Sequence, residues 1–267
     1  MYNPILLNYS THEGIVAFSS TRKGGCSKGE YASFNVNTYC GDNPDDITEN
    51  RKSLCRKLGI DTDCLVMPHQ VHGVKCVDID SAFMQLGHEE RTAVLEGVDA
   101  LATRLHGVCI GVSTADCIPI LMYDPKNTVV AAVHAGWRGT QQRILEHTLA
   151  FMKQHYETDT RDVMAYIGPG IGLDSFEVGQ EVYDAFAKAD FPMDTIARRY
   201  KDSKVDDMTK WHIDLWEANR IQLLAKGVDE ENIQVAGICT CLNTDLFFSA
   251  RKQGVDSGRM LTAIMIR

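Results

Sequence analysis

The chain has 267 residues, of which 44% are hydrophobic and 24% charged, an ordinary composition for a globular protein with a sizeable core. Its net charge of -9 disfavours a nucleic-acid partner, because proteins that bind the phosphate backbone usually present a net basic face. The sequence lacks an apolar run of membrane-spanning length and a secretory signal pattern, and its nine irregularly spaced cysteines predict reduced thiols in the cytoplasm.

The first half of the chain predicts several strands and one capped helix. Residues 14–19 are typical of a strand that runs into a glycine-rich basic loop. Pro44–Leu58 predicts a helix, since Asn43 or Asp42 can cap its start and Gly59 follows its end. Residues 81–96 are polar and acidic without a clean period, which predicts an exposed loop. Further strands are predicted at 65–67, 74–79, 100–103 and 108–113.

The second half begins with two apolar runs, 118–123 and 128–133, separated by the turn-forming residues 124–127. A helix is predicted from Thr140, because an apolar face repeats at helical spacing after it. That face consists of Ile144, Leu145, Thr148, Leu149 and Met152. Two more helices are predicted at 178–188 and 214–226, and strands at 234–239, 245–249 and 260–266.

The organisation of these elements predicts one domain over residues 1–267, since the sequence has no internal repeat, low-complexity tract or linker. Strands and helices alternate irregularly, and the two apolar runs form a hairpin. The predicted fold class is therefore mixed α/β, or α+β, with largely antiparallel sheets rather than a doubly wound parallel sheet.

The hairpin brings two chemically active side chains together. If residues 124–127 form the loop, Tyr123 lies opposite Thr128, and the same register places Cys117 opposite His134. Side chains that face each other across an antiparallel pair share a face, with their Cβ atoms about 4.5–5.5 Å apart. Such a thiolate and imidazole can bind one zinc ion. Spacing alone therefore predicts a shared Cys117–His134 site.

A third ligand is expected from the segment that contains His69 and His72. Residues three apart on an extended backbone face opposite sides, so only one of these two histidines should point at the metal. Cysteine with two histidines leaves the fourth tetrahedral position of zinc to water or substrate, as in catalytic zinc sites. Two alternatives stay open: a metal-free hydrolase with Cys117 as nucleophile and His134 as base, and a module that binds its ligand without turnover.

Anion-binding features lie beside this site. His134 is followed by a glycine-rich turn and a predicted helix start, where free N–H groups and Arg138 can bind phosphate. The loop around Arg22 is a second basic, glycine-rich turn. Arg251 and Arg259 flank another glycine-containing loop and are interpreted as a pocket lining or a solvated rim.

Motifs along nearly the whole chain resemble those of the laccase-domain, or polyphenol-oxidase-like, purine nucleoside phosphorylase family. HQVHG (69–73), TADCIP (114–119) and VHAGWRGT (133–140) in this order are the most specific of them. The other matching segments are TRKGGCS with ASFNV, GDNPDDITENR, IGPG, FEVG and FFSARKQGVDSGR. Two departures are Ser175-Phe176, where the family often has Cys-Tyr, and FFSARK, where it usually has FFSYRR.

The resemblance implies sheets sandwiched between helices and a zinc ion held by His72, Cys117 and His134. It further implies phosphorolysis of adenosine, inosine and methylthioadenosine, together with deamination of adenosine. Phosphate would then bind at Arg138 and Arg22, with Gln70 and Asn35 as candidates for hydrogen bonds to sugar or base. The family's oxidase label would require several copper ions on many histidines, whereas this chain has nine histidines and no His-x-His pair. Zinc is therefore favoured over copper, and the oligomeric state is left open. The binding module without turnover would, in this family context, bind metal or nucleoside.

Overall fold

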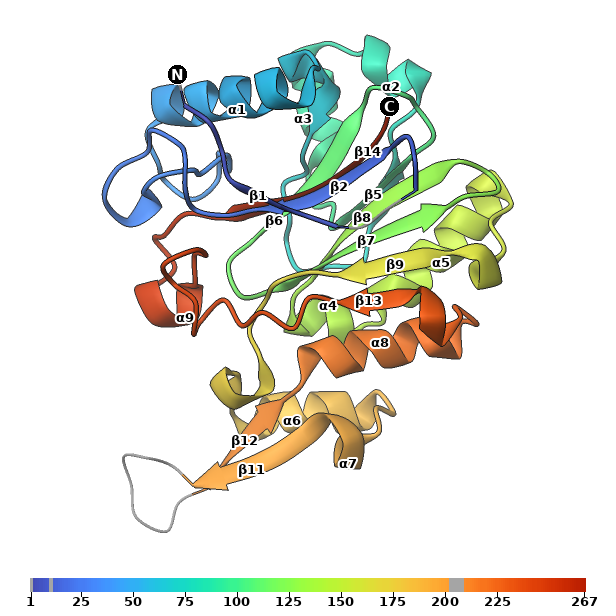
Figure 1. Cartoon of the computed structure of the whole chain (residues 1–267). Coiled ribbons are helices and arrows are strands. Elements are labelled where there is room, and N and C mark those ends of the chain that lie inside the picture. The colour runs from blue at the N-terminus through green and yellow to red at the C-terminus, as the bar shows by residue number, and fades with distance from the viewer. Residues whose placement is uncertain (1, 10–11, 202–208) are drawn as a thin grey trace.

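A computed structural model describes residues 2–9, 12–201 and 209–267 of the chain. Two sheets stack face to face at the centre, and helices lie on their outer sides (Figure 1). The first sheet consists, in order, of β1 (Leu6–Asn8), β2 (Ile15–Ser20), β14 (Met260–Ile266), β6 (Cys109–Thr114) and β3 (Leu65–Val66). The second consists of β13 (Ile233–Val235), β9 (Met164–Ile167), β7 (Ile118–Asp124), β8 (Val129–Ala135), β5 (Ala100–Thr103) and β4 (Cys76–Asp78).

A smaller third sheet lies beside these two and contains β10 (Glu177–Val178), β12 (Thr209–Ile213) and β11 (Ala197–Lys201). The longer helices are α1 (Pro44–Leu58), α3 (His88–Leu95), α5 (Ile144–Tyr156), α6 (Gln180–Lys188) and α8 (Leu215–Ala225). The shorter ones are α2 (Ser81–Gln85), α4 (Trp137–Gln141), α7 (Met193–Ile196) and α9 (Ala250–Gln253). Within the described ranges, no helix is both long and apolar enough to cross a membrane.

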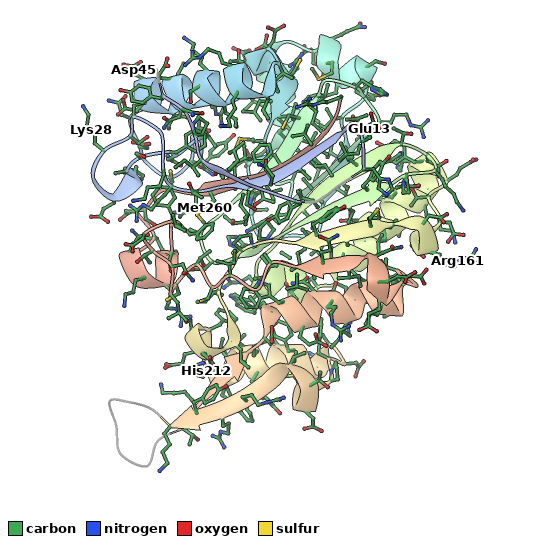
Figure 2. The ribbon with its side chains drawn as sticks, viewed as in Figure 1. Glu13, Lys28, Asp45, Arg161, His212 and Met260 are labelled. Atoms are coloured by element: carbon green, nitrogen blue, oxygen red, sulfur yellow. The ribbon has the colours of Figure 1, made fainter. Side chains whose placement is uncertain are left out.

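The two large sheets and the helices that cover them divide the hydrophobic core into separate layers. Fully buried residues such as Ile110 and Leu121 fill the space between the two large sheets, α1 packs on the outer face of the first sheet, and α5 and α8 pack on the second. Figure 2 shows Met260 inside the molecule, whereas Lys28 and Arg161 extend from its edge. Of the described strand pairs, only β3–β6, β4–β5 and β13–β9 are parallel. The predicted fold class, mixed and largely antiparallel sheets between helices, is confirmed.

Two predicted elements are wrong. Residues 81–96 form α2 and α3 instead of a loop, because the Asp80 side chain caps Phe83 N–H and Glu90 reaches back to Gly87 N–H. Residues 245–249 form the end of a turn and irregular chain instead of a strand. Phe247 and Phe248 are nevertheless buried there, so the apolar run reflected a core position and not strand geometry.

Several element boundaries also differ from prediction. The helix expected from Thr140 is two helices, α4 and α5, separated at Arg143, whose φ is 65°. Its predicted apolar face is confirmed, because all five residues are buried in α5. Val178 belongs to β10, so α6 begins only at Gln180, and β13 ends at Val235.

Candidate functional site

A cavity of about 520 Å³ opens where β6 ends and β7 begins. Of the residues that the sequence predicts to bind metal or substrate, Gln70, His72, Cys117 and His134 line it. Its other lining residues are Asn37, Tyr39, Cys40, His69, Ser113, Thr114, Ala115, Asp116, Ile171, Phe176, Ala250, Arg251, Val255 and Arg259. Polar and ionisable side chains dominate this list, so the cavity suits a polar small molecule.

His72, Cys117 and His134 converge in this cavity. Their ligand atoms all lie within 4.8 Å of one another, and Cys117 Sγ lies 3.8 Å from His72 Nε2. The two imidazole rings meet nearly edge to face, with centroids 4.8 Å apart. In the described part of the chain, no other group of three histidine, cysteine or acidic side chains is arranged to hold a metal ion.

The hairpin places Cys117 near His134, but in a different register from the one predicted. Pro119, not Cys117, lies opposite His134. The turn is the reason. The strands pair as far as Asp124 and Val129, and Thr128 lies in the loop with a φ of 52° instead of pairing with Tyr123. The observed register differs from the predicted one by two residues, so each side chain still lies on the face of the sheet that was predicted for it. Cys117 precedes β7 and reaches the site from the adjoining loop.

Asp99 connects the two histidines and was missed by sequence reasoning. Its carboxylate is fully buried, and Oδ1 lies 2.7 Å from Nδ1 of His134. A carboxylate only accepts, so Nδ1 of His134 carries the proton and Nε2 is left to bind a metal. The same carboxylate accepts hydrogen bonds from the N–H groups of Val71, His72 and Gly73 at 2.7–3.2 Å. The only sequence signal was a carboxylate directly before the buried strand β5.

Protonation in this group is coupled. Burial acts to raise the pKa of the Cys117 thiol, but the positive charge of His134 and hydrogen bonds with both histidines lower it to about 6. Burial acts to lower the pKa of His134, but the Cys117 thiolate and the hydrogen bond to Asp99 raise it to about 9. Without a metal, the pair is therefore a thiolate and an imidazolium at neutral pH.

The surroundings of the three ligands fit a metal ion. Tetrahedral zinc with bonds of about 2.3 Å to sulfur and 2.0–2.1 Å to nitrogen requires donors that lie roughly 3.3–3.6 Å apart, close to the observed Cys117–His72 separation. Gly136 packs directly against the group: a Cβ atom there would lie 2.7 Å from His72 Cδ2 and 3.0 Å from Cys117 Sγ. The close approach of the ligands therefore needs glycine at this position.

Of the four residues predicted to bind substrate or phosphate, Gln70 lines the cavity and the other three do not. Gln70 lies at the cavity, where its amide exchanges two hydrogen bonds of 2.8 Å with the backbone of Ser113. Asn35 is fully buried beside Asp42 and does not line the cavity. Arg22 does not line it either, because its guanidinium donates to the carbonyls of residues 32 and 244.

Arg138 is exposed and lies over the ring of Trp137, outside the cavity lining. The expected arrangement of Arg22 and Arg138 around the metal ligands is therefore not observed, and their role in phosphate binding stays a prediction. Arg251 and Arg259 line the cavity instead. Both guanidinium groups donate to main-chain carbonyls, and within the described ranges neither pairs with a carboxylate.

His69 does not belong to the metal-ligand group. Its Nδ1 lies 2.8 Å from a carboxylate oxygen of Glu96, and its ring stacks on Tyr39. This agrees with the prediction that only one of the two histidines points at the ligand group. His72 reaches the group from a left-handed backbone conformation, with a φ of 64°.

The fold and the site together define a class: mixed α+β proteins whose stacked sheets hold a histidine–cysteine–histidine group in a polar cavity. The chain belongs to the family described as multi-copper polyphenol oxidoreductase laccase, whose model matches residues 16–267. This confirms the family predicted from the motifs.

Several relatives cover nearly the whole chain. The chain is 46% identical to a purine nucleoside phosphorylase of Bacteroides thetaiotaomicron, over 96% of this chain and 93% of that protein. It is 43% identical to adenosine deaminase RL5 from an unknown prokaryotic organism, over 94% of each. Among solved structures, YlmD from Geobacillus stearothermophilus matches with a TM-score of 0.86 and 34% identity, over 96% of this chain and 93% of that one.

Proposed function

We propose that residues 1–267 form a single-domain, zinc-dependent purine nucleoside phosphorylase that acts on adenosine, inosine and methylthioadenosine and also deaminates adenosine. The observation that carries this proposal is the group of His72, Cys117 and His134, supported by Asp99, in a polar cavity. The names of the relatives at 46% and 43% identity support the two activities. We further propose that the protein works in the cytoplasm.

Zinc is the metal we propose for this site, although two histidines and one cysteine can also hold copper. Three protein ligands leave the fourth tetrahedral position of zinc for a substrate or water. When bound, zinc supplies Lewis-acid polarisation of an adjacent oxygen. The polyphenol oxidase activity is proposed, at most, as a minor one.

The protein's own groups then have distinct tasks. In phosphorolysis, a phosphate oxygen forms a bond to the anomeric carbon of the nucleoside, the bond from that carbon to the purine nitrogen breaks, and the base leaves with a proton. Arg251 and Arg259 lie at the cavity and bring positive charge to a phosphate there. Gln70 fixes the end of β6 against the loop that carries His72. Asp99 holds the imidazole of His134 in one tautomer.

The decisive experiment incubates metal-quantified protein with inosine or adenosine, with and without phosphate, and follows base and sugar phosphate by chromatography. Phosphate-dependent release of hypoxanthine or adenine together with ribose 1-phosphate is expected. The variant Cys117→Ala should lose both zinc and turnover. A Cys117→Ala enzyme that works at the wild-type rate would contradict the proposed site.

A second candidate function is a metal-free hydrolase with Cys117 as nucleophile. It is favoured by one observation, the lowered pKa of Cys117 next to a histidine that Asp99 orients. This function predicts alkylation of Cys117 by iodoacetamide at a rate that neither zinc nor a chelator changes. Binding of nucleoside without any product would instead indicate a module without turnover.

A further inference from the structure

Two aromatic rings lie against each other at the edge of the cavity. Tyr39 and His69 stack with ring centroids 4.0 Å apart and an angle of 19° between their planes. Both residues line the cavity that holds the metal-ligand group. Tyr39 is nevertheless 49% exposed, so much of its surface is open to another molecule.

Hydrogen bonds hold the two residues of the pair on both sides. The His69 imidazole lies 2.8 and 2.9 Å from the two carboxylate oxygens of Glu96, and its main chain bridges to the same residue. On the other side, the Tyr39 N–H donates to the Asn37 side chain, which in turn donates to Ser113 Oγ at 2.6 Å. The Tyr39 ring already stacks on His69, and a ring placed before binding loses less conformational entropy when a ligand stacks on it.

The remaining non-histidine aromatic ring of the cavity is less suited to this role. Phe176 is only 9% exposed, and the guanidinium of Arg251 lies 5.6 Å above the centre of its ring. Tyr39 therefore offers the open aromatic surface in the described lining of the cavity. Flat heteroaromatic rings gain about 1–3 kcal/mol from stacking on such side chains, and this gain is tolerant of base identity.

We propose that the Tyr39–His69 pair is the platform on which the purine base of the substrate stacks. This inference rests on the proposed phosphorylase function and adds the residues that recognise the base. A platform without a base-specific hydrogen bond accepts adenine and hypoxanthine alike. It therefore predicts a broad preference for purine nucleosides and a weak distinction among them.

The test measures binding of 2-aminopurine riboside, whose fluorescence falls when its base stacks, to the zinc-loaded protein. Tyr39→Ala and Tyr39→Leu should raise the dissociation constant about 5- to 150-fold, which corresponds to ~1–3 kcal/mol, and should lose the quenching. Tyr39→Phe keeps the ring and should restore both the affinity and the quenching. Inhibition by ribose 1-phosphate, which has no base, should be the same in all of these proteins.

A matched control is Tyr200→Ala, since Tyr200 is 39% exposed and also contacts a histidine, His212, but lies outside the cavity lining. Wild-type affinity and quenching in Tyr39→Ala and Tyr39→Leu would overturn the platform, as would a parallel loss of ribose 1-phosphate inhibition. Either result leaves the phosphorylase function standing if the wild-type protein still converts inosine. A wild-type protein that neither converts inosine nor binds the riboside would overturn both proposals.

Discussion

Replacing Asp99 with asparagine tests whether one buried carboxylate organises the metal ligands. Oδ1 accepts from Nδ1 of His134 and from the N–H of His72, whereas Oδ2 accepts from the N–H groups of Val71 and Gly73. An asparagine has only one acceptor oxygen. Whichever way its amide turns, the NH₂ group faces two donors, so two of the four hydrogen bonds are lost.

The size of the effect follows from that count. Hydrogen bonds to a charged acceptor contribute about 1.5–3 kcal/mol each, so losing two costs about 3–6 kcal/mol if the loop does not relax. Loss of a carboxylate that supports a metal-bound histidine typically weakens metal binding about 10- to 100-fold. Asp99→Asn should therefore lower both the free energy of unfolding and the affinity for zinc.

Asp124 provides a matched control at the far end of the same hairpin. It is also fully buried, and its Oδ1 accepts from the backbone N–H groups of Lys126 and Asn127, whereas its Oδ2 accepts from the side-chain amide of Asn127. Asp124→Asn can keep both backbone hydrogen bonds and loses only the one at Oδ2, so it should lower the free energy of unfolding, measured with urea, by less than Asp99→Asn does. Its zinc affinity, measured by competition with a chromophoric chelator, should stay unchanged. The reasoning is refuted if Asp99→Asn binds zinc as tightly as the wild type, or if both variants lose zinc affinity equally.

Four further predictions concern the site. In metal-free protein, alkylation of Cys117 by iodoacetamide should level off above about pH 7 instead of rising to pH 9, because its pKa is about 6, and added zinc should suppress it. The lowered pKa of Cys117 and the raised pKa of His134 act on stability in opposite directions. Between about pH 6.5 and 9 the folded pair and the unfolded pair each hold one proton, so this pair should leave the free energy of unfolding of metal-free protein, measured with urea, unchanged over that range. Gly136→Ala is compatible with the local φ of -67° but places a Cβ against His72 and Cys117, so zinc affinity should fall at least about tenfold with little change in the unfolding midpoint. Arg259→Gln should raise the KM for phosphate about tenfold and the KM for inosine much less, and equal increases in steady-state assays would argue against a phosphate role.

The sequence was most informative where local chemistry decides the structure. Pro44–Leu58 was predicted at its observed bounds because Asn43 caps the first turn and Gly59 ends the helix with a φ of 72°. The helices within residues 81–96 were missed because they lie on the surface with a single buried residue, Phe83, so no apolar period marks them. Their formation depends on caps that a count of apolar residues does not detect.

Only part of the site could be predicted from the sequence, and the reason is related. The motifs identified the three candidate metal ligands, which are brought together by the fold, but the partners that hold them lie far away in sequence. Asp99 is 35 residues from His134, and no local pattern marks a hydrogen bond over that separation. The arginines of the cavity, Arg251 and Arg259, were interpreted as a pocket lining or a solvated rim and do line the cavity, but the phosphate-binding role was predicted for Arg138 in the glycine-rich turn after His134 and for Arg22.

Two left-handed backbone positions help to bring His72 and Cys117 close to His134, although Cys117 does not lie opposite His134 in the hairpin. His72 has a φ of 64°, and Asp116, directly before Cys117, has a φ of 88°. Each is an unfavourable conformation for a residue with a side chain, and each is held by a buried carboxylate. Asp99 accepts from the N–H groups of the His72 loop, and Asp116 accepts from the Thr240 hydroxyl and the Arg251 N–H. Two anchored loops, more than strand pairing, therefore set the distances between the ligands, and substitutions at these carboxylates should perturb the metal site more than substitutions along the strands.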